Sequence, residues 1–232
     1  MKQQLTIPRL SGSALKVMAV LSMVIDHTAY YLMNHDTWLY EGMRCFGRIA
    51  FPVFALLVAE GFAHTKDRMK YFLSLLCCAV LSELPWYLLS GNDGSHNVML
   101  TLSIGIIALT VFEGWKHRPW LACAAIAILA FASDWLGVDY GCRGILLIVI
   151  FFLLRKRKGD HVLHTHRLFA ILLAFPLMMH YGIIGAFLAS LVILMYDGHR
   201  GFIKGNFGKY AFYAIYPLHL WVIWWVILIT KF

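Results

Sequence analysis

The sequence predicts an all-α fold, a polytopic bundle of transmembrane helices that forms a single domain over residues 1–232. Three observations predict it: an apolar composition, about nine apolar segments and a one-sided distribution of basic residues. The chain is 61% hydrophobic and 14% charged, and its mean hydropathy is +0.71. Soluble domains are about 45–50% apolar and about 25% charged. A lipid bilayer is therefore the expected solvent for this chain.

The apolar segments are the expected helices. A perpendicular transmembrane helix needs about 20 residues, with a range of about 17–25. The segments fall at about 14–33, 47–63, 71–90, 98–115, 119–136, 142–154, 167–180, 182–196 and 211–230. The sixth, seventh and eighth are short, and we expect them to tilt or, for the last two, to form a re-entrant hairpin around Tyr181 and Gly182. The first segment contains Asp26 and His27 and is expected to be a retained span.

The basic residues predict the orientation. With the N-terminus inside, the 20 lysines and arginines lie on the inner side, except for Arg44, Arg48, Arg143 and Lys231. Lys and Arg are enriched in cytoplasmic loops, so we expect the N-terminus inside and the C-terminus outside. The run at 155–161, RKRKGDH, is then a solvated inner loop.

Other function classes lack their sequence signals. The net charge of +8 is explained by these inner loops, and no basic stripe with interleaved aromatic residues predicts nucleic-acid binding. The five cysteines show no CxxC or Cys/His spacing, so no metal site is expected. P-loop, Gly-x-Ser-x-Gly, His-Glu-x-x-His and dinucleotide motifs are absent from the sequence.

A few ionisable residues lie inside the apolar segments. Each costs about 2.5–3.5 kcal/mol on insertion scales, so each needs a partner or a function. They are Asp26, His27, Arg48, Glu60, Glu83, Glu113 and His219. Under the predicted orientation, most of this polarity falls in the outer half of the bundle, together with Asn97, Thr101, Asp139 and Tyr140.

His27 is the principal candidate. Imidazole titrates near neutrality and can accept a proton from an attacking amine or hydroxyl. The alternative is a neutral histidine that is hydrogen-bonded within the bundle. Asp26 and His27 are adjacent on a helix, so their side chains diverge by about 100° and each needs a partner on another helix. Glu83 and Arg48 lie at a similar depth and are candidate partners.

The remaining candidates each have a structural alternative. Arg48 either extends to lipid headgroups or binds a phosphate or carbonyl oxygen. Glu83 either forms a structural ion pair or orients His27. His219 follows Pro217 and either packs in the core with one hydrogen bond or takes part in a site. Polarity alone thus predicts a site within a membrane and leaves its reaction open.

Several short motifs carry a resemblance to a known family. They are Lys16 to His27, ending in VIDH; GRIAFPVFALLVAEGF at 47–62; SELPW at 82–86; NVMLTLSIG at 97–105; DWLGVDYGCRGILL at 134–147; and YAFYAIYPLHL at 210–220. In this order, they resemble the TraX family over nearly the whole chain. That family is similar to the larger superfamily of membrane acyltransferases that includes the O-antigen acetylases.

The resemblance implies a multi-pass protein of the bacterial inner membrane that transfers an acetyl group from acetyl-CoA. The acceptor would be an amine or a hydroxyl, on the N-terminus of pilin or on an envelope glycan. The resemblance places the catalytic histidine at His27. Asp26 or Glu83 would then orient the imidazole, and Arg48 would stabilise the oxyanion. The expected cofactor-binding residues are Arg48, Asn97, Thr101, Tyr140 and His219, with the CoA phosphates held by basic inner loops.

Two other functions compete with acetyl transfer. Intramembrane Asp, Glu and His residues also fit a proton-coupled transporter of small molecules, although no internal repeat supports that fold class. The third hypothesis is a non-catalytic factor for pilus or envelope assembly.

Overall fold

In the computed structural model, the described residues (9–155, 163–203 and 205–230) fold into helices without a β-strand. The helices are α1 (Gly12–Leu32), α2 (Trp38–Gly47), α3 (Ala50–His64), α4 (Arg68–Ser90), α5 (Val98–Gly114), α6 (Pro119–Trp135), α7 (Gly141–Leu153), α8 (Leu163–Met179), α9 (Ile183–Leu194) and α10 (Gly205–Thr230). The predicted all-α class is confirmed. Most of the predicted loop at 155–161 lies outside the described residues.

Several helices have the length and apolar composition of membrane-spanning segments. Three described segments are long and apolar enough to cross a membrane: Trp38–His64, Arg68–Ser90 and Gly208–Thr230. Five further apolar helices are shorter. These features indicate a helical membrane protein, and the number of crossings and the orientation remain predictions.

Helix α2 corrects the sequence-based assignment. Residues 34–46 lie between the apolar segments expected at about 14–33 and 47–63, and no helix is predicted there. Instead, the Thr37 hydroxyl accepts a hydrogen bond from the Tyr40 amide at 3.2 Å and caps a helix that continues to Gly47. Capping of this kind satisfies an otherwise unpaired N–H group of the first turn. The helix is then interrupted by a turn at Arg48 and Ile49 before α3 begins.

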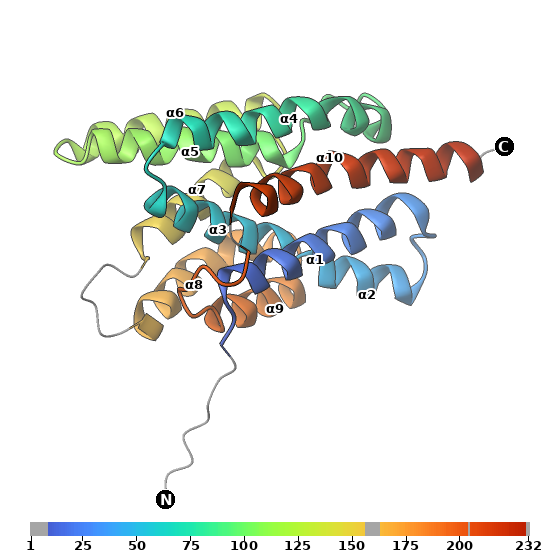
Figure 1. The fold of residues 1–232 in the computed structure, drawn as a ribbon, viewed down its shortest axis with the longest axis horizontal. Coiled ribbons are helices and arrows are strands. Elements are labelled where there is room, and N and C mark those ends of the chain that lie inside the picture. Colours follow the sequence, from blue (N-terminus) through green and yellow to red (C-terminus); the bar gives the residue numbers. More distant parts are fainter. Residues whose placement is uncertain (1–8, 156–162, 204, 231–232) are drawn as a thin grey trace, which may run out of the picture.

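Helices α3 and α7 form the centre of the bundle (Figure 1). Helix α3 packs against α1, α5, α7 and α9, and α7 also packs against α5, α6 and α8. Phe62 of α3 meets Phe152 of α7 edge to face, and both rings are fully buried. Helices α8 and α9 pack against each other around Tyr181 and Gly182. The predicted helix pair at this position is therefore confirmed.

A close approach at Gly47 joins α1 to the end of α2. The Ser22 hydroxyl of α1 is 2.8 Å from the Phe46 carbonyl oxygen and 3.0 Å from the Gly47 carbonyl oxygen. A Cβ atom at Gly47 would overlap the carboxyl group of Asp26. The absence of a side chain here lets the α2–α3 junction reach the polar part of α1.

We predict that Gly47→Ala lowers the thermal unfolding midpoint of the purified protein. The added methyl group overlaps Asp26, and overpacking of this kind costs about 1–3 kcal/mol. Gly42→Ala in the same helix is the matched control, because its Cβ would meet no heavy atom within 4 Å. Equal midpoints for the two variants would contradict the close packing described for Gly47.

Candidate functional site

The site is built around a histidine pair that joins α1 to α10. His27 Nδ1 lies 2.6 Å from His219 Nε2, and the two rings are nearly coplanar, with an interplanar angle of 8°. His219 Nδ1 lies 3.1 Å from the Ile215 carbonyl oxygen, one helical turn earlier in α10. The first and the last helix therefore share a continuous chain of hydrogen bonds.

This chain fixes the tautomers of the neutral pair. The Ile215 carbonyl can only accept, so His219 Nδ1 carries the proton and donates it. In a neutral imidazole the other nitrogen is then an acceptor, so His219 Nε2 accepts from His27 Nδ1–H. His27 Nε2 is left with a free lone pair, and no described residue is hydrogen-bonded to it. An unprotonated ring nitrogen of this kind is what a general base requires.

Aromatic rings and two arginines surround His27. Its ring lies edge to face with Tyr31 at 6.2 Å and with Trp86 at 6.3 Å between centroids. The charges of Arg44 and Arg48 act on it from the α2 side. His27 is only partly buried, so part of the side chain remains accessible.

Asp26 has a different partner from the one expected. Its Oδ2 accepts a hydrogen bond from Arg44 Nη1 at 2.5 Å. Its other oxygen is buried against Gly47 and has no hydrogen-bond partner among the described residues. The expectation that Asp26 would orient His27 is wrong in this structure, because the two adjacent side chains diverge around α1 and His219 occupies the Nδ1 side of His27.

Glu83 also contacts a different histidine. Its carboxylate lies 2.5 Å from His96 Nδ1 and accepts a second bond from the Asn97 amide at 2.5 Å. The expectation that Glu83 would orient His27 or balance Arg48 is therefore wrong too. The Asn97 amide also donates to the Ala79 carbonyl, and its side-chain oxygen caps α5 by accepting from the Met99 amide. Asn97 thus supports the junction of α4 and α5.

Thr101 positions the loop between α6 and α7. Its buried hydroxyl donates a hydrogen bond to the Asp139 carbonyl. The Tyr140 amide donates to Asp139 Oδ1 at 3.0 Å, while burial, the largest effect, raises the pKa of the Asp139 carboxyl to about 7. Near neutral pH this carboxyl is therefore only partly ionised and only partly offsets the charge of Arg48.

Tyr140 is held in an uncommon backbone conformation. Its φ of 62° lies in the left-handed region, which costs a non-glycine residue about 1–3 kcal/mol and concentrates at functional sites. Its ring stacks on Phe51 with centroids 3.7 Å apart and lies 4.5 Å from Tyr181. The conformation directs the tyrosine ring onto α3 instead of toward solvent.

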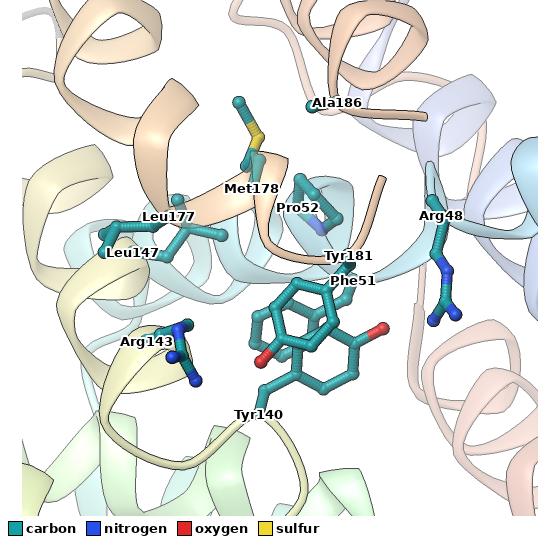
Figure 2. A pocket seen from close by; sticks show the side chains of 10 residues that line it. All are labelled: Arg48, Phe51, Pro52, Tyr140, Arg143, Leu147, Leu177, Met178, Tyr181 and Ala186. Atoms are coloured by element: carbon teal, nitrogen blue, oxygen red, sulfur yellow. The ribbon is translucent and has the colours of Figure 1, made fainter. Parts of the chain in front are cut away.

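A narrow cleft lies around these rings. Figure 2 shows Arg48 and Arg143 on opposite sides of the rings of Phe51, Tyr140 and Tyr181. The other lining residues are Pro52, Leu147, Leu177, Met178 and Ala186. The cavity volume is about 10 Å³, which is close to the minimum that one water molecule needs.

The cleft has the chemistry of a site for an anionic or carbonyl oxygen. Two guanidinium groups and two phenol groups offer hydrogen-bond donors. The guanidinium group of Arg48 has no ion-pair or hydrogen-bond partner among the described residues, and Arg143 lies beside the Tyr181 hydroxyl. The charge of Arg48 acts on both His27 and Tyr140, although His27 itself does not line the cleft.

The structure therefore brings together part of the predicted site. His27 and His219 are in contact, Arg48 and Tyr140 line one cleft, and the charge of Arg48 acts on His27. Asn97 and Thr101 are engaged within the protein, and Glu83 belongs to a separate group with His96. Sequence reasoning missed Arg44 and Tyr181 as site residues, since Arg44 lies on the unpredicted helix α2 and Tyr181 lies in a turn with no polar pattern. Among the described residues, no group of three or more His, Cys, Asp or Glu could hold a metal ion.

Comparisons with known proteins give a family and two named relatives. A family model described as TraX protein matches residues 11–227. "Probable fimbrial assembly protein FimC, serogroup H1" from Dichelobacter nodosus is 28% identical over 90% of this chain and 93% of that protein. "Protein TraX" from Escherichia coli (strain K12) is 28% identical over 59% of this chain and 53% of that protein. No solved structure matches the chain.

We predict that Arg44→Met lowers the free energy of unfolding by about 3–5 kcal/mol, because removing one partner of a buried ion pair leaves the other charge uncompensated. Adding Asp26→Asn to this variant removes that charge and recovers much of the loss. Arg68→Met is the control, since Arg68 pairs with Glu113 where both side chains are partly exposed and such pairs contribute about 1 kcal/mol or less. Additive effects of Arg44→Met and Asp26→Asn in detergent-solubilised protein would contradict the pairing.

Proposed function

Because this chain belongs to the TraX family, we propose that it is an integral membrane acetyltransferase that transfers an acetyl group from acetyl-CoA to an envelope acceptor. The observation that carries the proposal is the hydrogen-bonded pair His27–His219, which leaves His27 Nε2 unprotonated. The name of the fimbrial relative makes a pilin subunit the first acceptor to test, and an envelope glycan is the second. The proposed location is the inner membrane, with the N-terminus inside.

In the proposed reaction, His27 removes the proton from the acceptor. The acceptor amine or hydroxyl attacks the thioester carbonyl of acetyl-CoA, and His27 Nε2 takes the proton that the nucleophile loses. The tetrahedral intermediate then collapses, the carbon–sulfur bond breaks, and the proton passes from His27 to the leaving thiolate. The products are the acetylated acceptor and CoA with a free thiol. General acid–base catalysis of this kind contributes about 10²–10⁴-fold to a rate.

His219 is a positioning residue in this scheme. It does not touch the reacting atoms, and its hydrogen bond selects the tautomer of His27. It also stabilises the imidazolium that forms after proton transfer, because His219 Nε2 accepts from His27 Nδ1–H in both protonation states. The role resembles that of the group that orients the histidine in catalytic triads.

Arg48 is the proposed stabiliser of the oxyanion. Its guanidinium group has no described partner, and its charge acts on His27. A preorganised donor that is aimed at developing negative charge contributes about 2.7–4 kcal/mol. The neighbouring cleft holds about one water molecule, so substrate binding in this scheme must separate the rings of Tyr140 and Tyr181.

The name of the fimbrial relative also fits a non-catalytic assembly factor. That function predicts stable complexes with a partner that persist when His27 is replaced, and no consumption of acetyl-CoA. Reconstituted protein that moves a small molecule without releasing CoA would favour a transporter. The assays below separate these functions from acetyl transfer.

We predict that purified wild-type protein releases free CoA thiol from acetyl-CoA in the presence of a peptide with a free α-amino group. His27→Ala should lower the rate by at least about 10²-fold, since the general base is lost, and His219→Phe should lower it less. His35→Ala is the control, because His35 lies in the exposed loop before α2. Detection of the N-terminally acetylated peptide as a product distinguishes acetyl transfer from hydrolysis of acetyl-CoA. A normal rate for His27→Ala would refute the proposal.

We further predict that Arg48→Gln lowers kcat by about 10²–10³-fold with little change in KM, as expected when one oxyanion donor is removed. Arg48→Lys should retain part of the rate because it keeps the charge. Arg68→Gln, which changes an arginine that pairs with Glu113, is the control. An effect of Arg48→Gln on KM alone would contradict oxyanion stabilisation and assign Arg48 to substrate binding.

A further inference from the structure

Three basic residues meet where α1 begins. Lys16 lies just after the first turn of α1, Arg200 lies in the connection between α9 and α10, and Lys209 lies in the first turns of α10. The connection is tied to α1 by hydrogen bonds: the Gly12 amide donates to the His199 carbonyl at 2.7 Å, and the Ser13 hydroxyl donates to the Arg200 carbonyl at 2.8 Å. These bonds hold the three cations at one end of the α1–α10 pair.

No described carboxylate forms an ion pair with these three cations. Lys16 is partly buried, has no ion-pair or hydrogen-bond partner among the described residues, and experiences the positive charges of Arg200 and Lys209. Of the described acidic residues near this end, Glu60 lies beside His64, Asp67 caps α4 and Glu113 pairs with Arg68. Asp197 lies in the same connection as Arg200, where its carboxylate accepts a hydrogen bond from the His199 amide and forms no ion pair with Lys16, Arg200 or Lys209 among the described residues. Like charges that are brought together out of water are unfavourable, and a bound anion would relieve this.

Aromatic rings accompany the cations. The ammonium group of Lys209 lies 5.9 Å from the Tyr71 ring centroid, 5.5 Å from that of Tyr210 and 5.7 Å from that of Tyr213. Tyr71 comes from α4, which packs along α10, and Tyr210 is exposed. Cations bind phosphate oxygens, and tyrosine rings stack on nucleobases. Together they fit a phosphorylated nucleotide better than a simple anion.

The distance to the histidine pair matches a long, thin ligand. At a rise of about 1.5 Å per residue, Lys16 lies about 16 Å from His27 along α1, and Lys209 lies about 15 Å from His219 along α10. Helices α1 and α10 pack against each other, and Figure 1 shows the blue and red helices running side by side. An extended pantetheine arm is of comparable length.

We propose that Lys16, Arg200 and Lys209, with the rings of Tyr71 and Tyr210, bind the phosphorylated adenosine end of acetyl-CoA. The pantetheine arm then follows the α1–α10 contact and presents its thioester to His27. This assignment rests on the proposed acetyltransferase function. In the predicted orientation the cluster faces the cytoplasm, where acetyl-CoA is made.

The test is equilibrium binding of CoA to the purified full-length protein in detergent. Wild type and His27→Ala should bind CoA equally, and adenosine 3′,5′-bisphosphate should compete whereas pantetheine should not. Lys16→Gln and Lys209→Gln should each weaken CoA binding at least about tenfold, with Lys16→Arg close to wild type. Lys116→Gln, in the turn between α5 and α6, is the control. Unchanged unfolding midpoints without ligand show that the variants are folded.

The outcomes separate this assignment from the proposed function. If Lys16→Gln and Lys209→Gln bind CoA as wild type does while His27→Ala abolishes transfer, the nucleotide site is wrong and the enzyme remains. If wild type neither binds CoA nor consumes acetyl-CoA, both proposals fail. Anionic lipid headgroups also carry phosphate groups that these cations could bind. Binding of the same variants to phosphatidylglycerol vesicles is therefore measured as well. Loss of vesicle binding in the Lys16 and Lys209 variants with unchanged CoA affinity would assign the cluster to lipid.

Discussion

The hydrogen bond between His27 and His219 is the interaction on which the candidate site depends. It joins the first and last helices of the bundle at a depth where polar groups are costly. Because the Ile215 carbonyl fixes the proton of His219, the tautomer of His27 in α1 is set by the backbone geometry of α10. The chain of hydrogen bonds therefore has one direction: His27 Nδ1–H on α1 donates to His219, His219 Nδ1–H donates to the Ile215 carbonyl on α10, and the free lone pair is at His27 Nε2.

The surrounding polar groups form separate pairs that keep this arrangement intact. Asp26 and Arg44 compensate each other between α1 and α2, while Glu83, His96 and Asn97 join α4 to the start of α5. Thr101 and Asp139 fix the loop that carries Tyr140. Apart from one oxygen of Asp26, these groups satisfy their buried polar atoms locally. Arg48 remains a cation whose charge acts on His27 and whose guanidinium group has no ion-pair partner among the described residues. An unprotonated base, His27, together with a cation that has no described ion-pair partner, Arg48, suits a reaction in which negative charge develops on oxygen.

Much of the fold could be predicted from the sequence, because long apolar segments allow few alternatives to helices in a bilayer. Helix α2 could not, since the apolar and polar residues of WLYEGMRCFG do not distinguish an amphipathic helix from a loop. In the candidate site, His27, Arg48 and Tyr140 could be predicted as site residues from their predicted depth in the membrane and from the sequence motifs that contain them. The contact of His27 with His219 was not, because depth along each helix leaves open which faces meet. For the same reason the sequence left open whether Glu83 orients His27, balances Arg48 or forms a structural ion pair, and in the fold it contacts His96.

His27 presents an unprotonated Nε2 while its Nδ1–H is donated to His219. Nitrogen-15 chemical shifts of labelled histidine in the protein at neutral pH test it most directly, with His27→Ala to assign the signals. We expect the Nε2 signal of His27 to have the shift of an unprotonated ring nitrogen and the Nδ1 signal to have that of a protonated one, with this preference reduced in His219→Phe. A protonated Nε2, or an imidazolium at neutral pH, would contradict it.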